Sequence, residues 1–168
     1  MQERIGHYVL QVIEELQGIY LVEFRLKGPK RGPKIEIILD TDSGIRIAEC
    51  ARFSRRLREL LESDADLLAE TGDDFELMVS SPGLGEPLKL ARQYIRHTGK
   101  PLRITYADEA GTEKEIFGHL AEVRFQDDER PSITLFPIQK KAGGRKTEKQ
   151  PLTLYLDRIV RAVPEAVL

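Results

Sequence analysis

The sequence has one cysteine, three histidines and no long apolar run. A single cysteine cannot form an internal disulfide, which favours a reducing cytoplasm. No stretch approaches the roughly 18 apolar residues that a membrane span needs, and the charged N-terminal segment lacks the apolar centre of a signal peptide. No Cys/His cluster is spaced to hold zinc. We therefore expect a cytoplasmic protein that contains no metal and does not enter a membrane.

Catalytic motifs are also missing from the sequence. The histidines are scattered over separate predicted elements, so none is evidently placed to activate a nucleophile. Ser80 and Ser81 follow a predicted strand, but the GxSxG elbow of a serine hydrolase is absent. Residues 143–147 (GGRKT) lack the glycine spacing and the strand-to-helix context of a phosphate-binding loop. We predict no enzyme, no cofactor and no small-molecule substrate; a hydrolase using Ser80 or Ser81 is the alternative.

Excess charge of one sign is absent as well, since the net charge is −2 over 168 residues. Such a balance argues against a protein that coats nucleic acid by charge alone. The charges are nevertheless segregated: residues 24–34 contain only cations, including Lys30 and Arg31, and residues 62–76 contain only acids. Separation of this kind can orient a molecule on a mixed surface of RNA and protein, although it can also be ordinary surface decoration.

The hydrophobic periodicity of the first half predicts helices and strands in alternation. The expected elements are a helix over 2–16, strands over 20–27 and 35–39, and a helix over 47–61. The loop over 28–33 makes the two strands a hairpin with Lys30 and Arg31 at its tip. The second helix is expected to bury a face containing Ile47, Cys50 and Leu57, and the acidic segment over 62–74 is expected to be a linker.

A third strand and a rigid turn follow in the segment 73–88 (DDFELMVSSPGLGEPL). Phe75, Leu77 and Val79 alternate with polar residues, as in a strand with one buried face. The Ser-Ser-Pro-Gly sequence then ends the strand, with Pro82 and Gly83 at the central positions of a turn and Gly83 at positive φ. Outward-facing N–H groups and serine hydroxyls would suit a phosphate or a carbonyl of a partner. A turn that merely closes a domain is the alternative.

A short helix is predicted directly after this turn. Leu88, Ala91 and Ile95 would face inward, and the cations Lys89, Arg92 and Arg96 would share the opposite side. Three cations on one helix face form the best candidate phosphate-contacting surface in the chain. A solvated helix face would give the same pattern.

From residue 101 onward the pattern predicts strands only. Five strands are expected, over 101–106, 114–125, 133–135, 152–156 and 159–163, with Gly118 at a strong bend in the second. Such a series is typical of a small Sm-like or SH3-like barrel. The loop over 139–150 carries cations among glycines and is expected to be mobile.

The fold class predicted from these patterns is α+β. The order helix, strand, strand, helix, strand indicates a two-layer sandwich with an antiparallel sheet and both helices on one face. This layout is similar to a KH-type RNA-binding module, although the GXXG loop that clamps RNA is missing. The small barrel follows, so we expect two domains, residues 1–98 and 99–168.

The segment FELMVSSPGLGEPL resembles the signature of the ribosome maturation factor RimP family. The resemblance extends to the layout on both sides and so covers nearly the whole chain. It departs from the usual family pattern at Gly85 and Glu86, where Asp and Arg are common.

This resemblance implies a non-catalytic assembly factor that binds the free or immature small (30S) ribosomal subunit. The implied partners are ribosomal RNA and a small-subunit ribosomal protein. The protein itself is expected to be a monomer. The residues expected to make these contacts come from the signature, the helix after it and the hairpin tip: Ser80, Ser81, Pro82, Gly83, Leu84, Lys89, Arg92, Arg96, Lys30 and Arg31. The alternative is a general RNA-binding regulator built from KH-like and Sm-like modules.

Overall fold

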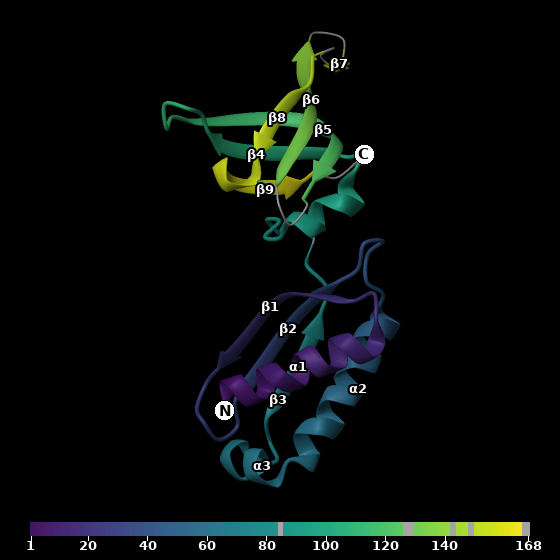
Figure 1. The fold of residues 1–168 in the computed structure, drawn as a ribbon, viewed down its shortest axis with the longest axis vertical. Coiled ribbons are helices and arrows are strands. Elements are labelled where there is room, and N and C mark those ends of the chain that lie inside the picture. The colour runs from purple at the N-terminus through teal and green to yellow at the C-terminus, as the bar shows by residue number, and fades with distance from the viewer. Residues whose placement is uncertain (84–85, 126–129, 142–143, 148–149, 166–168) are drawn as a thin grey trace. The chain divides into compact units, whose positions relative to one another are not determined.

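The computed structural model describes residues 1–83, 86–125, 130–141, 144–147 and 150–165. Contacts divide the chain into two compact units, Met1–Pro82 and Gly83–Leu168. The first unit consists, in chain order, of α1 (Gln2–Leu16), β1 (Tyr20–Lys27), β2 (Lys34–Asp40), α2 (Ile47–Ser63), α3 (Ala65–Thr71) and β3 (Glu76–Ser80). The helices and strands predicted from periodicity are confirmed, and the chain has the expected α+β class (Figure 1).

The sheet of the first unit has the order β1-β2-β3. β1 and β2 are antiparallel, as the predicted hairpin requires. β3, however, runs parallel to β2, so the prediction of an antiparallel sheet is wrong for this pair. The reason is the connection, because the chain returns through α2 and α3 to the end of the sheet at which β2 began. The ends of β2 and β3 therefore lie at the same edge of the sheet.

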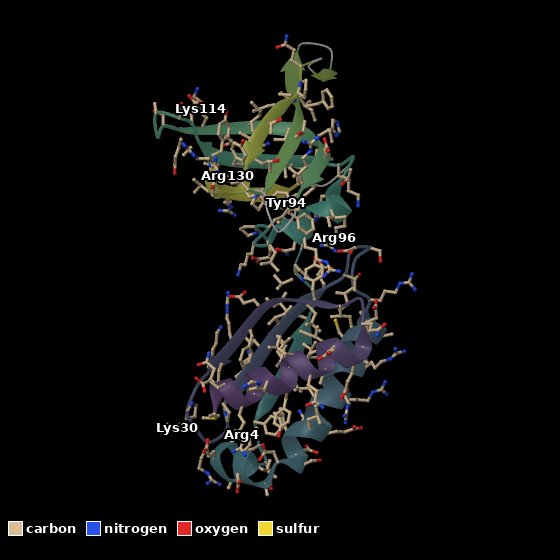
Figure 2. The ribbon with its side chains drawn as sticks, in the orientation of Figure 1. Arg4, Lys30, Tyr94, Arg96, Lys114 and Arg130 are labelled. Carbon is tan, nitrogen blue, oxygen red and sulfur yellow. The ribbon has the colours of Figure 1, made fainter. Side chains whose placement is uncertain are left out.

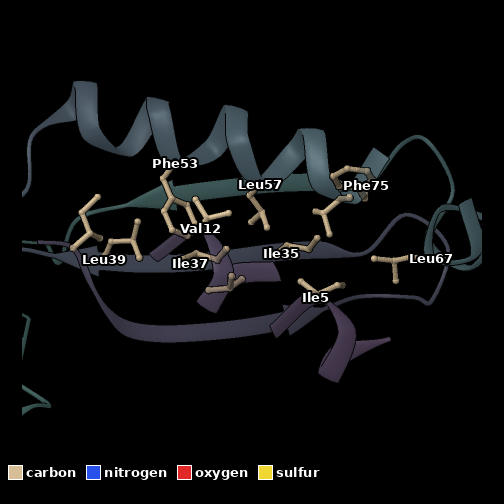
Figure 3. Packing of buried hydrophobic residues seen from close by; sticks show 12 residues of the cluster. Ile5, Val12, Ile35, Ile37, Leu39, Phe53, Leu57, Leu67 and Phe75 are labelled. Atoms are coloured by element: carbon tan, nitrogen blue, oxygen red, sulfur yellow. The ribbon is translucent and has the colours of Figure 1, made fainter. Parts of the chain in front are cut away.

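The core of the first unit lies between the sheet and the helices (Figure 3). β2 contributes Ile35, Ile37 and Leu39, each buried to 1% exposure or less. α2 buries Phe53, Leu57 and Leu61, which recur every four residues and so share one face. The predicted face of this helix is partly wrong, since Ile47 is 90% exposed and Cys50 is only half-buried. Ile47 is the first residue of the helix.

The acidic linker expected over 62–74 contains the helix α3, which sequence reasoning missed. Asp64 caps it, because its carboxylate oxygen Oδ1 accepts a hydrogen bond from the Leu67 amide at 3.1 Å. Gly72 ends it at φ 76°, with its amide donating to the Leu68 carbonyl at 2.8 Å. Asp64 also accepts a hydrogen bond from the Tyr8 hydroxyl at 2.7 Å, which ties α3 to α1. The sequence does contain a signal for this helix, namely an Asp eight residues before a Gly, with helix-forming residues between them.

An ionic contact joins α1 to α2. The Arg56 guanidinium donates two hydrogen bonds to the Glu15 carboxylate, at 2.7 Å and 3.0 Å. These hydrogen bonds, together with one from Gln11, lower the pKa of Glu15 to about 2 from its ordinary value of 4.5. Because the folded state lowers this pKa, the ionised carboxylate stabilises the fold at neutral pH.

We therefore expect a pH-dependent difference in stability between the wild-type protein and Glu15→Gln. The wild type should be the more stable above about pH 5, and its advantage should disappear as the pH falls from about 4.5 toward 2. Urea unfolding of both proteins across this range would measure it. Glu14→Gln, at a neighbouring exposed position, is the control and should reproduce the wild-type profile more closely. A difference that stays constant with pH would contradict the role given to Glu15.

The second unit contains a short 3₁₀ helix followed by strands. Its elements are η1 (Ala91–His97), β4 (Pro101–Ala107), β5 (Glu113–Arg124), β6 (Ser132–Lys141), β7 (Gly144–Thr147), β8 (Leu152–Tyr155), η2 (Leu156–Arg158) and β9 (Ile159–Pro164). The predicted strands are all present, while β6 is longer than expected and β7 was not predicted. Much of the loop predicted over 139–150 is thus strand; residues 142–143 and 148–149 lie outside the described residues.

The strands of the second unit form a small barrel. Their order is β7-β6-β5-β4-β9, with β8 also paired to β6. β8 and β9 thus pair at opposite ends of the series β6-β5-β4, yet only the 3₁₀ turn η2 separates them in the chain. A sheet whose two edges are joined by one tight turn must curl upon itself. Leu102, Ile104, Leu120, Ile133 and Leu135 fill the interior without measurable exposure.

Gly118 of β5 lies against the backbone of the paired strand β6. A Cβ at this position would come within 2.9 Å of the Phe136 carbonyl oxygen and 3.3 Å of the Pro137 Cα. Glycine is therefore required here by the approach of another backbone, which supports the expectation that this position must lack a side chain.

The segment 83–98 packs with the second unit, whereas the predicted division placed it in the first. The Leu88 amide donates to the Ala162 carbonyl of β9 at 2.8 Å, and Tyr94 belongs to the barrel core. By contacts the first compact unit ends at Pro82, whereas the predicted boundary is residue 98. Among the described helices, none is long and apolar enough to cross a membrane.

Candidate functional site

The signature begins at the end of β3. Leu77 and Val79 pack against the core, so the alternation of the strand places Met78 and Ser80 on the other face of the sheet. Ser80 is half-buried and lies opposite Ile38 of β2, while Ser81 is exposed. Of the two signature serines, Ser81 is therefore the more accessible to a partner.

The turn after the serines differs from the predicted one. Gly83 does not have positive φ, and its carbonyl accepts a hydrogen bond from the Glu86 amide at 3.3 Å. It consequently occupies the first position of a turn that ends at Glu86, and not the third position of a turn centred on Pro82 and Gly83. The first position of a turn does not demand a left-handed residue. Leu84 and Gly85 lie outside the described residues.

Gly83→Ala is accordingly expected to leave the stability within about 0.5 kcal/mol of wild type. The added methyl would be 3.4 Å from Glu86 Cγ, the flexible side chain of an exposed residue. Gly72→Ala provides a matched contrast, since Gly72 has φ 76° and its Cβ would lie 3.0 Å from Asp74 Oδ1. This substitution should cost about 1 kcal/mol or more. Thermal unfolding of both variants would measure the difference, and equal effects would contradict it.

The helix that carries the candidate cations is a 3₁₀ helix, which changes the predicted face. With three residues per turn, side chains three apart lie above one another. The buried side chains of this helix are Gln93, Tyr94 and His97, at 1%, 4% and 8% exposure, and Leu88 packs against the barrel core. Ile95, which was predicted to face inward, is half-buried. Burial raises the pKa of Tyr94 to about 12.

The three cations on this segment differ in accessibility. Lys89 is exposed, whereas Arg92 and Arg96 are half-buried. The Arg96 guanidinium donates to His97 Nε2 at 3.3 Å, and the figure places Arg96 on the same short helix as Tyr94 (Figure 2). Gln93 holds the start of this helix, because its side-chain oxygen accepts from the amides of Lys89 and Leu90. Of these three cations, Lys89 is therefore the most accessible to a binding partner.

Lys30 and Arg31 lie away from the signature serines. Their loop precedes β2, at the edge of the sheet where β2 and β3 begin, and the serines are at the edge where β3 ends. Five paired residues separate the two edges, a length of roughly 15 Å along the strands. Arg31 also donates to the Ala69 carbonyl of α3 at 3.4 Å. Within the first unit the fold therefore does not gather the predicted residues into one site.

A pocket on the barrel was not predicted from the sequence. It has a volume of about 380 Å³, and its lining comes from the ends of β4 and β8 and the turns beside them: Tyr106, Ala107, Asp108, Glu109, Arg130, Leu152, Thr153, Leu154, Tyr155 and Arg158. The Arg130 guanidinium lies 3.9 Å from the centroid of the Tyr155 ring. Two 2.6 Å hydrogen bonds from Arg130 to the Asp157 carboxylate fix the orientation of the guanidinium.

Among the described residues, no group of histidines, cysteines and carboxylates is arranged to hold a metal.

These features define the class of protein: an α+β unit followed by a small barrel, with basic and aromatic side chains presented at its surface. A family model described as the RimP N-terminal domain matches residues 9–85. A ribosome maturation factor RimP of Pelodictyon phaeoclathratiforme is 50% identical over 173 aligned residues, covering all of both chains. The corresponding protein of Chlorobium phaeobacteroides is 47% identical over all of both chains, and that of Chlorobium limicola is 49% identical over all of this chain and 98% of its own. The chain belongs to the ribosome maturation factor RimP family.

Proposed function

We propose that this protein is a non-catalytic assembly factor that binds the free or immature small ribosomal subunit in the cytoplasm. The observation that supports the proposal is full-length similarity, at 50% identity, to a protein named ribosome maturation factor. Because the similarity spans both compact units, the two would act together on one particle. Its partners would be ribosomal RNA and a ribosomal protein, and the protein itself would be a monomer.

The mechanism we propose is stabilisation of one conformation of the immature subunit. A protein that binds one conformation more tightly than another shifts the population toward the first, and no bond needs to be made or broken. Ser81 and Lys89, the exposed hydroxyl and cation on either side of the signature turn, would contact phosphate or carbonyl groups of the subunit.

Co-sedimentation tests this function. The purified protein is mixed with small subunits, large subunits or assembled ribosomes and centrifuged through a sucrose cushion. We expect it in the pellet with small subunits only. Equal recovery with all three particles would favour general RNA binding, and no recovery with small subunits would refute the proposal.

Replacing Lys89, Arg92 and Arg96 together by glutamine should weaken binding to the small subunit about tenfold or more at moderate salt. Loss of phosphate contacts should also flatten the salt dependence, since each contact releases counterions. A variant in which Arg52, Arg55 and Arg161 become glutamine loses equal charge elsewhere and is the control. Thermal unfolding of both variants checks that they are folded. Unchanged affinity and unchanged salt slope would assign these cations to ordinary solvation.

A further inference from the structure

The barrel pocket contains a stack that is open to solvent on its outer side. Tyr155 is 44% exposed although it lies on a barrel strand. The Arg130 side chain, which covers one part of this ring, remains 46% exposed itself. Figure 2 labels Arg130 on the barrel. Tyr106, at the end of β4, adds a second aromatic ring to the same lining.

The orientation of the Arg130 guanidinium is set before any ligand arrives. Its Nε and Nη2 both donate to Asp157, so rotation of the planar group is restricted. The Tyr155 ring supports one face through a cation–π contact. A flat ligand that stacks here would therefore restrict little additional side-chain freedom, which favours binding.

A cation at the rim suits a phosphate. Arg158 is exposed and donates through Nη1 to the Asp108 backbone carbonyl, a neutral acceptor, at 3.0 Å. Its charge also acts on the Asp157 carboxylate, whose hydrogen bonds come from Arg130. The nearby carboxylates have other partners, because Asp108 pairs with Lys114 at 3.4 Å and Asp157 pairs with Arg130. Glu109 also lines the pocket and would repel any phosphate beside it, which leaves Arg158 as the place for one phosphate. The lining thus fits one nucleotide better than a length of phosphate backbone.

We propose that this pocket binds a single unstacked nucleotide of RNA, with its base against the Arg130–Tyr155 stack and a phosphate at Arg158. Bases that are not paired are commonly held on aromatic rings and guanidinium planes, largely without regard to sequence. The inference deepens the proposed function, on which it rests for the identity of the RNA as ribosomal. It locates on the second unit a contact with a single-stranded loop or end.

The test uses the full-length protein and a fluorescein-labelled RNA of eight adenosines. Fluorescence anisotropy should show that the protein binds this strand, with lower affinity than it has for the small subunit. An abasic ribose-phosphate strand of equal length should bind at least tenfold more weakly than the adenosine strand. Tyr155→Ala and Arg130→Lys should each weaken binding of the adenosine strand about tenfold. Tyr155→Phe keeps the ring and should retain wild-type affinity. Arg158→Gln should weaken binding, whereas Arg161→Gln, an exposed arginine outside the pocket, should not.

The outcomes separate this inference from the proposed function. If the pocket variants keep wild-type affinity for the adenosine strand, or the abasic strand binds equally well, the inference is wrong even where small subunits still bind. If pocket variants weaken only subunit binding and the wild type does not bind the strand, the pocket contacts a protein and the inference is again wrong. Should Tyr155→Ala fail to fold, Arg130→Lys and Arg158→Gln decide the matter. Absence of small-subunit binding by the wild type would refute the proposed function alone.

Discussion

Gly118→Val should destabilise the barrel by roughly 3 kcal/mol or more, or prevent it from folding. The first added carbon would already lie 2.9 Å from the Phe136 carbonyl oxygen, and the contact is with backbone that belongs to the paired strand β6. Relief would require β5 and β6 to separate, which would break their hydrogen bonds. For a unit of this size the melting temperature should fall by roughly 12 °C or more.

Glu113→Val is the matched control for this substitution. It introduces the same side chain into the same strand, at an exposed position at the start of β5. Calorimetry of both variants would give the comparison, and the control should remain within about 0.5 kcal/mol of wild type. Equal stability of the two variants would show that β5 and β6 can separate at Gly118 without cost.

Phe53→Ala should be the most damaging truncation in the first unit, at about 3–5 kcal/mol. Phe53 is the largest of the completely buried side chains, and it packs between α2 and the sheet (Figure 3). Its removal leaves a cavity whose walls, β2 and α2, are regular elements that cannot readily collapse into it. The neighbouring Arg52→Ala changes an exposed residue of the same helix and should have little effect. A loss below about 1 kcal/mol for Phe53→Ala would contradict this account of the core.

Together these two variants test whether Met1–Pro82 and Gly83–Leu168 fold independently. We propose that they do, because each has its own closed core. Phe53→Ala should then shift only the transition of the first unit and Gly118→Val only that of the second. A single transition displaced by both substitutions would show that the units unfold as one.

The local elements of this protein were determined by its sequence alone. The spacing of Ile5, Val9 and Val12 defines one face of a helix, and that of Ile35, Ile37 and Leu39 defines one face of a strand, wherever these elements pack. The need for glycine at position 118 was also visible, as an interruption in a long strand. The signature FELMVSSPGLGEPL indicated the family, which the full-length relatives confirm.

Only the tertiary structure decided how these elements combine. β3 pairs parallel to β2 because the chain passes through two helices between them. The alternation of residues within β3 does not indicate the direction in which the strand pairs. Gly83 was misassigned and the helix after it is of the 3₁₀ type, because turn position and helix type depend on what the segment packs against, here the barrel. The barrel pocket joins Tyr106, Arg130 and Tyr155 from positions far apart in the chain. A site of this kind exists only after strand pairing has brought its residues together, so local sequence could not indicate it.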